Sequence, residues 1–482
     1  MLGRTRVGQL ALALIVSLWF ASPGLAQQAT LQEAPAEASL QLATIFADHM
    51  VLQRDQPIPI WGTATPASLV RVQLGSKTRE ATAGADGAWR VDMGPLSAGG
   101  PLEMKIWTDG ATLHVTDILV GEVWIASGQS NMQWTIANSD DAAAEIAASD
   151  WPQIRHVNVP RQPAATPQDS FESYGWFPCE PVHIKNFSAV AYFFGRELHK
   201  NLNVPIGLIG TNYGGTPMEA WTSLEALASR PAFAAAAKHA AALHDGKGQM
   251  AKNRPSGLFN AMVHPLVPYG IRGVIWYQGE ANAGRHEHYR ELSELMITDW
   301  RQRWGQGDFP FLLVQLAAWK PDVKTWPYLR EAQLQTIQTV PYTGMAVTTD
   351  VGDRADIHPR NKQAVGKRLA LAARALAYGE DIEYSGPIYE QMDTKGKSAY
   401  LSFAHVGAGL VARAGTLRGF TIAGSDREFV PATAKIEGDQ IIVSSDQVTA
   451  PVAVRYNWST WTEGNLYNAE GLPASPFRTD RF

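Results

Sequence analysis

The chain has 482 residues, of which 45% are hydrophobic and 18% charged, a balance typical of a folded protein of two to four domains. The formal net charge is -5, so the chain has no basic field that could hold nucleic acid or an anionic membrane. Composition and charge therefore exclude these two classes of partner.

The first 26 residues have the features of a secretory signal peptide. Arg4 and Arg6 precede an uncharged apolar run from Leu10 to Phe20, and small residues at Gly24-Leu25-Ala26 suit a cleavage site. The apolar run is too short to span a membrane comfortably. We therefore expect a secreted or periplasmic protein whose mature form has no membrane segment and begins with a tether at residues 27–40.

Cys179 is the only cysteine in the chain. Export normally permits disulfides, but a single cysteine cannot form one within the chain, so burial must supply the stability. We expect Cys179 to be a small core residue rather than a reactive thiol.

Short apolar segments separated by turn residues indicate an antiparallel β-sandwich over residues 41–116. The turn GADG (84–87), which leads into the strand pattern AWRVDM, is a clear example. Strand patterns return after Gly379, for example in AKIEGDQIIV, where Glu437-Gly438-Asp439 form the turn. They predict a second antiparallel β unit over residues 381–482.

The centre of the chain, residues 117–380, alternates differently. Continuous apolar runs are separated by amphipathic helical segments, one of which extends from about His288 to Trp304. This alternation predicts an α/β domain with a parallel sheet, helices on both faces, and ligand sites at the carboxyl ends of the strands. The apolar runs are VWIA (123–126), IGLIG (206–210), GVIWY (273–277), FLLVQL (311–316) and MAVTT (345–349).

The first polar motif, SGQSNM (127–132), directly follows the run at 123–126. Gly128 allows a sharp turn, after which Ser130 emerges at the strand tip, where a base can reach its hydroxyl. Met132 stands where GxSxG requires glycine, so this is not the α/β-hydrolase nucleophile turn. A helix N-cap is an equally weighted interpretation of Ser130.

The second motif, GTNYGGTPMEAW (210–221), also follows an apolar run. Adjacent Gly214 and Gly215 let backbone N–H groups approach a ligand, as an oxyanion site requires, although a plain tight turn explains them equally well. The third motif, WYQGEAN (276–282), offers amide and carboxylate groups beside another strand end. A polar loop is the alternative for this third motif.

The fourth motif lies in residues 348–379. His358 precedes Pro359, a suitable first residue for a helix that ends at Gly379. An acid close to His358 could hold the imidazole in one tautomer, so His358 is a candidate general base. The acids nearby are Asp350, Asp353 and Asp356.

These motifs, in this order, resemble those of the SGNH hydrolases, specifically the sialate O-acetylesterase family. The resemblance covers most of the chain: FADHMVLQRDQPIPIWG near the start, then SGQSNMQW, GGTPMEAWTS, IWYQGEAN, DIHPRNKQAVGKRLALAARALAYGE, and NLYNAEGLPASPFRTD at the end. It implies an SGNH-type central sheet and a secreted serine esterase that removes acetyl groups from sugar hydroxyls without a metal or other cofactor.

The resemblance also implies roles for single residues. Ser130 matches the nucleophile and His358 the general base. Gly215, with Gly214 beside it, matches an oxyanion donor, and the Ser130 N–H would be a second donor.

Two positions depart from the superfamily's usual pattern. QGEAN replaces GxND, so either Gln278 or Asn282 is expected to supply the side-chain oxyanion donor. Asp356 lies two residues before His358 rather than three, and we expect it to be the triad acid ahead of Asp353 and Asp350.

Glu280, Trp134 and Trp276 are expected to contact the sugar, because tryptophan rings offer flat apolar surfaces beside polar groups. The expected substrate is an O-acetylated carbohydrate, either O-acetyl sialic acid or a plant polysaccharide such as xyloglucan or xylan. A non-catalytic carbohydrate-binding protein is the alternative of another class. Such a protein would not need a nucleophile and a base in contact. The sequence predicts no oligomeric state.

Overall fold

The computed structural model describes residues 39–242 and 251–482. The predicted signal peptide and most of the predicted tether lie outside these residues. In the part of the chain that is described, no helix has the length and apolar character needed to cross a bilayer.

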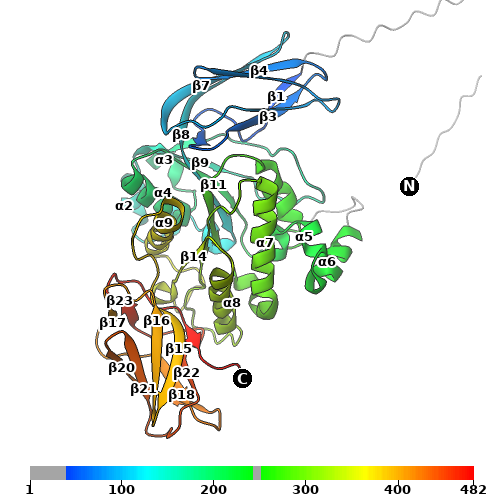
Figure 1. Cartoon of the computed structure of the whole chain (residues 1–482). Coiled ribbons are helices and arrows are strands. Elements are labelled where there is room, and N and C mark those ends of the chain that lie inside the picture. Colours follow the sequence, from blue (N-terminus) through cyan, green and yellow to red (C-terminus); the bar gives the residue numbers. More distant parts are fainter. Residues whose placement is uncertain (1–38, 243–250) are drawn as a thin grey trace, which may run out of the picture. The chain divides into compact units, whose positions relative to one another are not determined.

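A mixed sheet forms the centre of the protein (Figure 1). Its middle strand, β8 (Thr112–Gly128), pairs in parallel with β11 (Ile206–Asn212) on one side and β12 (Gly273–Tyr277) on the other. The parallel arrangement continues outward, which confirms the predicted α/β fold class. The outer strands are β9 (Trp151–Asn158), β13 (Phe311–Val314) and β14 (Thr343–Ala346), with β10 (Phe177–Cys179) antiparallel at the edge beside β9.

Both faces of this sheet are buried because successive side chains of each strand enter different apolar clusters. Val123 and Ile125 pack with residues of α7 (Tyr289–Trp304) and α8 (Trp326–Thr339). Trp124 and Ala126 pack with α4 (Ala189–Leu202) and α9 (Lys362–Tyr378) on the other face. The continuous apolar runs in the sequence have this physical origin. Cys179 is fully buried in the second cluster, and burial raises the pKa of its thiol to about 12.

Two helix predictions have different outcomes. The helix predicted from about His288 to Trp304 is α7, and α9 ends at Gly379, whose φ of 69° closes the helix in the left-handed region. The prediction that Pro359 opens α9 is wrong. The helix begins at Lys362 because the Asn361 side chain caps it by accepting a hydrogen bond from the Ala364 N–H.

The strand β8 belongs to two parts of the fold. Its first half pairs antiparallel with β7 (Gly99–Trp107), and its second half runs parallel to β11 and β12. The boundary expected at residues 116 and 117 therefore falls inside one continuous strand. The other strands before β8 are β1 (Leu40–Leu42), β2 (Val51–Gln53), β3 (Pro59–Ala64), β4 (Leu69–Leu74), β5 (Lys77–Thr82) and β6 (Ala88–Asp92).

Antiparallel strands after residue 387 form the second β unit around an apolar core of their own. Arg330 of α8 is fully buried and donates to the carbonyls of Ser459 and Thr460, which ties this unit to the central sheet. The strands are β15 (Ile388–Lys395), β16 (Ser398–Ala404), β17 (Leu410–Ala412), β18 (Phe420–Ala423), β19 (Phe429–Pro431), β20 (Thr433–Glu437), β21 (Gln440–Ser444), β22 (Ala453–Tyr456), β23 (Leu466–Asn468) and β24 (Phe477–Arg478).

Short helices and turns connect these elements. They are α1 (Ser130–Gln133), α2 (Ala142–Ala147), α3 (Pro181–Ile184), α5 (Leu224–Ala228) and α6 (Pro231–Ala242), with the 3₁₀ turns η2 (Met218–Trp221) and η5 (Glu280–His288) after β11 and β12.

Candidate active site

Ser130 stands directly beyond the carboxyl end of β8. Gly128 has a φ of 132° and lies against the backbone of Tyr277, where a Cβ would collide. Gln129 is the N-cap of α1, with no side-chain capping bond, and Ser130 is the first residue of the helix. The N-cap interpretation of Ser130 is therefore not the one that the structure adopts, and its hydroxyl is left for other contacts.

The hydroxyl of Ser130 meets His358, which arrives 228 residues later in the loop between β14 and α9. The distance from Ser130 Oγ to His358 Nε2 is 2.9 Å. On the other side of the ring, His358 Nδ1 lies 2.9 Å from Asp356 Oδ1, which also accepts the His358 backbone N–H at 2.9 Å. If Nδ1 carries the proton, Nε2 presents its lone pair to the serine hydroxyl.

Asp356 is the acid in contact with the imidazole. Burial works to raise its pKa, but the hydrogen bonds from the His358 N–H and ring outweigh burial and lower it, so the carboxylate is ionised. The other two candidates are engaged elsewhere. Asp350 binds Arg368 through both oxygens, and Asp353 accepts the N–H groups of Ala355 and Asp356.

Trp134 stacks on the imidazole of His358. The ring centroids are 5.1 Å apart and the planes differ by 12°, while Trp134 Nε1 donates to the Asn138 carbonyl at 2.9 Å. This anchored ring restricts the imidazole to one plane. Trp134 was expected to contact the sugar, and in this structure one face of its ring contacts His358.

The two glycines after β11 differ in what their N–H groups do. A Cβ on Gly214 would lie 3.2 Å from Ser130 Cβ, so the loop passes directly over the serine. The Gly214 N–H is occupied, because it donates to Gln133 Oε1 at 2.7 Å. In the described part of the chain, the Gly215 and Ser130 N–H groups have no protein acceptor. These two N–H groups are therefore free to donate hydrogen bonds to an oxyanion.

The side chains of Gln278 and Asn282 brace the loops. Gln278 Nε2 donates both protons, to the Thr216 carbonyl at 3.2 Å and to Asn282 Oδ1 at 2.7 Å. Gln278 is fully buried and is not available as the side-chain oxyanion donor. Asn282 Nδ2 donates one proton to Glu219 Oε2 at 2.9 Å and keeps the second. Of the two expected donors, Asn282 alone retains a proton.

Asn131, the residue after Ser130, joins the motifs below the site. Its Nδ2 donates to Glu280 Oε1 at 2.6 Å and to the Ile357 carbonyl at 3.1 Å, next to His358. Its Oδ1 accepts from Lys362 Nζ at 2.5 Å. Asn131 and Lys362 are buried, and so is the Glu280 carboxylate, whose Oε2 has no hydrogen-bond partner among the described residues. Asn131 therefore ties the serine and histidine segments together.

Burial shifts both charged groups around Asn131 towards their neutral forms. It raises the pKa of Glu280, and it lowers the pKa of Lys362 from 10.5 to about 7. The expectation that Glu280 contacts the sugar is wrong, because its carboxylate points into this buried cluster.

Trp276 lies in the core, away from the serine. Its side chain is 1% exposed and packs edge-on against Trp221 and Trp300. The expectation that Trp276 contacts the sugar is therefore wrong. Its position in β12 explains this, because every residue of that strand is buried.

Sequence reasoning missed four residues of the site. Asn131 and Gln133 lie inside SGQSNMQW and could have been considered, because short polar side chains beside a nucleophile need partners. Lys362 lies inside the fourth motif, where nothing distinguishes it from the other basic residues, and Lys252, which contacts Gly214, lies in a segment without a motif. No group of three or more His, Cys, Asp or Glu side chains within residues 39–242 and 251–482 is placed to bind a metal.

The chain is similar to known carbohydrate esterases. A family model described as "Carbohydrate esterase, sialic acid-specific acetylesterase" matches residues 120–375. The sialate O-acetylesterases of Homo sapiens and Mus musculus are 32% and 30% identical to it, each over 92% of this chain and over 93% and 94% of their own lengths. A carbohydrate acetylesterase from Xanthomonas citri aligns with a TM-score of 0.85 at 42% identity, over 92% of this chain and 100% of that one.

Proposed function

Because the chain belongs to the sialic acid-specific acetylesterase family of carbohydrate esterases, we propose that it deacetylates sugars through Ser130, His358 and Asp356. Family membership makes the chain a carboxylic ester hydrolase that acts on O-acetylated carbohydrates. The observation that supports these three residues is the unbroken contact from Asp356 through His358 to Ser130, with 2.9 Å at each step.

The proposed reaction has two acyl-transfer steps. Ser130 Oγ attacks the acetyl carbonyl carbon while His358 Nε2 takes the hydroxyl proton, and the carbonyl π electrons move onto the oxygen. The Ser130 and Gly215 N–H groups stabilise this oxyanion. Its collapse releases the sugar hydroxyl, which takes the proton from His358 and leaves an acetyl-serine. Water, deprotonated by His358, then attacks the acetyl carbonyl; the bond to Ser130 Oγ breaks, His358 returns the proton to that oxygen, and acetate leaves.

Replacing Ser130 by Ala tests this assignment. Without the hydroxyl no acetyl-enzyme can form, so turnover of 4-nitrophenyl acetate should fall by at least about 10³-fold while the unfolding midpoint stays the same. Ser127→Ala is the matched control, because that buried serine lies three residues earlier in β8. A Ser130→Ala protein that keeps wild-type turnover would disprove the proposal.

The identity of the acetylated sugar is a separate question from the reaction class. The curated relatives are named for sialate, whereas the structural neighbour is named for carbohydrate in general. Acetate release from O-acetyl sialic acid, acetylated xylan and acetylated xyloglucan, assayed side by side with Ser130→Ala as the blank, identifies the sugar. If the chain were a binding protein only, none of the three would release acetate above that blank.

We also propose that the enzyme is exported, on the strength of the basic, apolar and small-residue order in residues 1–26. N-terminal sequencing of the protein recovered outside the cytoplasm tests this proposal. A mature chain that still begins at Met1 would contradict it.

A further inference from the structure

Lys252 contacts the loop of Gly214 and Gly215 at the Gly214 carbonyl oxygen. This oxygen belongs to the same peptide unit as the Gly215 N–H. Lys252 Nζ donates to the Gly214 carbonyl at 2.6 Å and lies 5.1 Å from the centre of the Tyr213 ring. It also lies 3.3 Å from the position that a Cβ on Gly215 would take. In the described residues, no carboxylate forms an ion pair with Lys252, so its charge acts mainly on this loop.

The Gly214 carbonyl and the Gly215 N–H belong to one peptide unit. This peptide is trans, so the two groups lie in one plane and point in opposite directions. A cation held on the carbonyl oxygen fixes the plane and so aims the N–H away from Lys252. The same cation draws electrons toward the oxygen, which makes the N–H a stronger donor.

The Gly214 residue is held at a second point by Gln133, whose Oε1 accepts the Gly214 N–H at 2.7 Å. Gln133 belongs to α1, the helix that begins with Ser130. The loop is therefore fixed to the nucleophile's helix on one side and to Lys252 on the other. Between these anchors, Gly215 adopts a φ of 71° and its N–H has no protein acceptor in the described chain.

We propose that Lys252 is a positioning residue that orients and polarises the Gly214–Gly215 peptide, so that the Gly215 N–H stabilises the oxyanion of acyl transfer. This inference rests on the proposed function. Negative charge develops on the acetyl oxygen only as Ser130 Oγ attacks, so Lys252 stabilises the transition state more than the bound ester. The side chain itself does not touch the substrate.

Three variants at this position separate charge from hydrogen bonding. Lys252→Met loses both, Lys252→Gln keeps a neutral donor, and Lys252→Arg keeps the charge. We expect Lys252→Met to lower kcat about 10- to 100-fold with little change in KM, Lys252→Gln to fall between, and Lys252→Arg to stay near wild type. Lys77→Met is the matched control, because Lys77 also donates to a backbone carbonyl, that of Pro95, in the N-terminal strands.

A second readout separates polarisation from simple support of the loop. A trifluoromethyl ketone that adds to Ser130 forms a tetrahedral oxyanion, so its inhibition constant should rise by the factor by which kcat/KM falls. If Lys252→Met keeps kcat within about twofold of wild type, or loses kcat without weaker inhibition by the ketone, Lys252 does not position the Gly214–Gly215 peptide for oxyanion stabilisation. Either result would leave the proposed function standing while Ser130→Ala remains inactive, whereas an active Ser130→Ala would remove the basis of both.

Discussion

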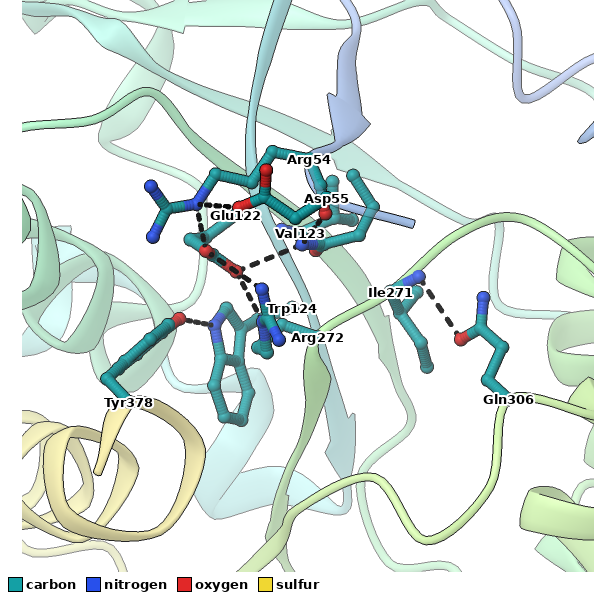
Figure 2. A network of polar contacts seen from close by, with 10 residues as sticks. Arg54, Asp55, Glu122, Val123, Trp124, Ile271, Arg272, Gln306 and Tyr378 are labelled. Atoms are coloured by element: carbon teal, nitrogen blue, oxygen red, sulfur yellow. Dashed lines mark hydrogen bonds and ion pairs between the residues drawn. The ribbon is translucent and has the colours of Figure 1, made fainter. Parts of the chain in front are cut away.

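A carboxylate is buried at each end of the parallel part of β8, and the two carboxylates differ in how many hydrogen-bond partners they have. At the start, Glu122 is completely buried and both of its oxygens are saturated (Figure 2). Oε1 accepts from Arg54 and Arg272, and Oε2 accepts from Gln53 and Arg272. Beyond the other end, within the part of the chain that the structure describes, the Glu280 carboxylate has one hydrogen-bond partner, Asn131, and its Oε2 has none.

The difference shows how one sheet serves two purposes. Paired charges around Glu122 hold the loop after β2 and the segment before β12 against β8, and Trp124 and Tyr378 pack beside them through a 3.1 Å hydrogen bond (Figure 2). Near Ser130 the charges are only partly paired, so burial is not offset and shifts the pKa values of Glu280 and Lys362 towards their neutral forms. A saturated network suits stability, and an unsaturated one suits a reacting site.

Breaking the saturated end should have the largest effect on stability. Glu122→Gln keeps the shape but removes the buried counter-charge of Arg272 and leaves Arg54 with only the more exposed Asp55, so the free energy of unfolding should fall by about 3 kcal/mol. Urea denaturation measures this, and turnover by the protein that remains folded should be close to wild type. Glu80→Gln is the control, because Glu80 pairs with Arg71 at an exposed position, where a pair is worth less than about 1 kcal/mol. Equal losses in the two variants would refute the comparison.

The sequence predicts the strands of the central sheet far better than it predicts which buried carboxylate has all of its hydrogen-bond partners. Short continuous apolar runs bounded by turn residues indicate strands buried on both faces, so β8, β11 and β12 follow from the pattern. The same pattern places the serine and glycine motifs at strand ends. Whether a carboxylate there is saturated depends on partners that lie far away in the chain. Glu280 and Lys362 are 82 residues apart and meet through Asn131.

The wrong predictions about single site residues have the same cause, because the contacts that decide them come from distant parts of the chain. Trp276 and Gln278 belong to or adjoin β12, and their neighbours in sequence do not reveal that packing from η2 and α7 covers them. Lys252 has no signal at all in the sequence, because its role depends on a single contact with Gly214 across 38 residues. Local pattern predicts where a site lies, and tertiary contacts decide which of its groups remain free.

Replacing Asn131, the residue at the centre of the incompletely paired cluster near Ser130, should have the next largest effect, which is a loss of catalytic rate. Asn131→Ala leaves Lys362 and Glu280 without their shared partner and frees the Ile357 carbonyl beside His358. Small misplacements of the serine and imidazole cost about 10²-fold, so we expect a loss of about that size in kcat, with KM little changed. Steady-state kinetics on 4-nitrophenyl acetate measures both constants.

Asn138→Ala is the control for that experiment, because Asn138 makes an exposed hydrogen bond to Thr135 close to the same helix. It should retain wild-type kinetics. A full kcat in Asn131→Ala would mean that the Ser130 to His358 contact does not depend on the buried cluster.

The smallest expected effect is on the pH dependence of the unfolding free energy. It tests whether Lys362, unlike the arginines around Glu122, lacks a full counter-charge. In the folded protein burial lowers the pKa of Lys362 to about 7, against 10.5 for an exposed lysine. Between these values the unfolded chain binds one proton more than the folded chain, so this group makes stability rise with pH. It should contribute about 1.4 kcal/mol per pH unit near the middle of that window. Lys362→Met lacks the group and should lose that slope.

Urea denaturation of wild type and Lys362→Met at several pH values between about 8 and 10 tests this expectation, since the difference in unfolding free energy should grow in favour of wild type as pH rises. Lys367→Met, on the exposed side of the same helix, serves as the control and should leave the slope unchanged. Parallel pH curves for wild type and Lys362→Met would mean that Lys362 stays fully charged in the fold. The charges of Lys362 and Glu280 would then offset each other across Asn131, and the two ends of β8 would both hold compensated charge.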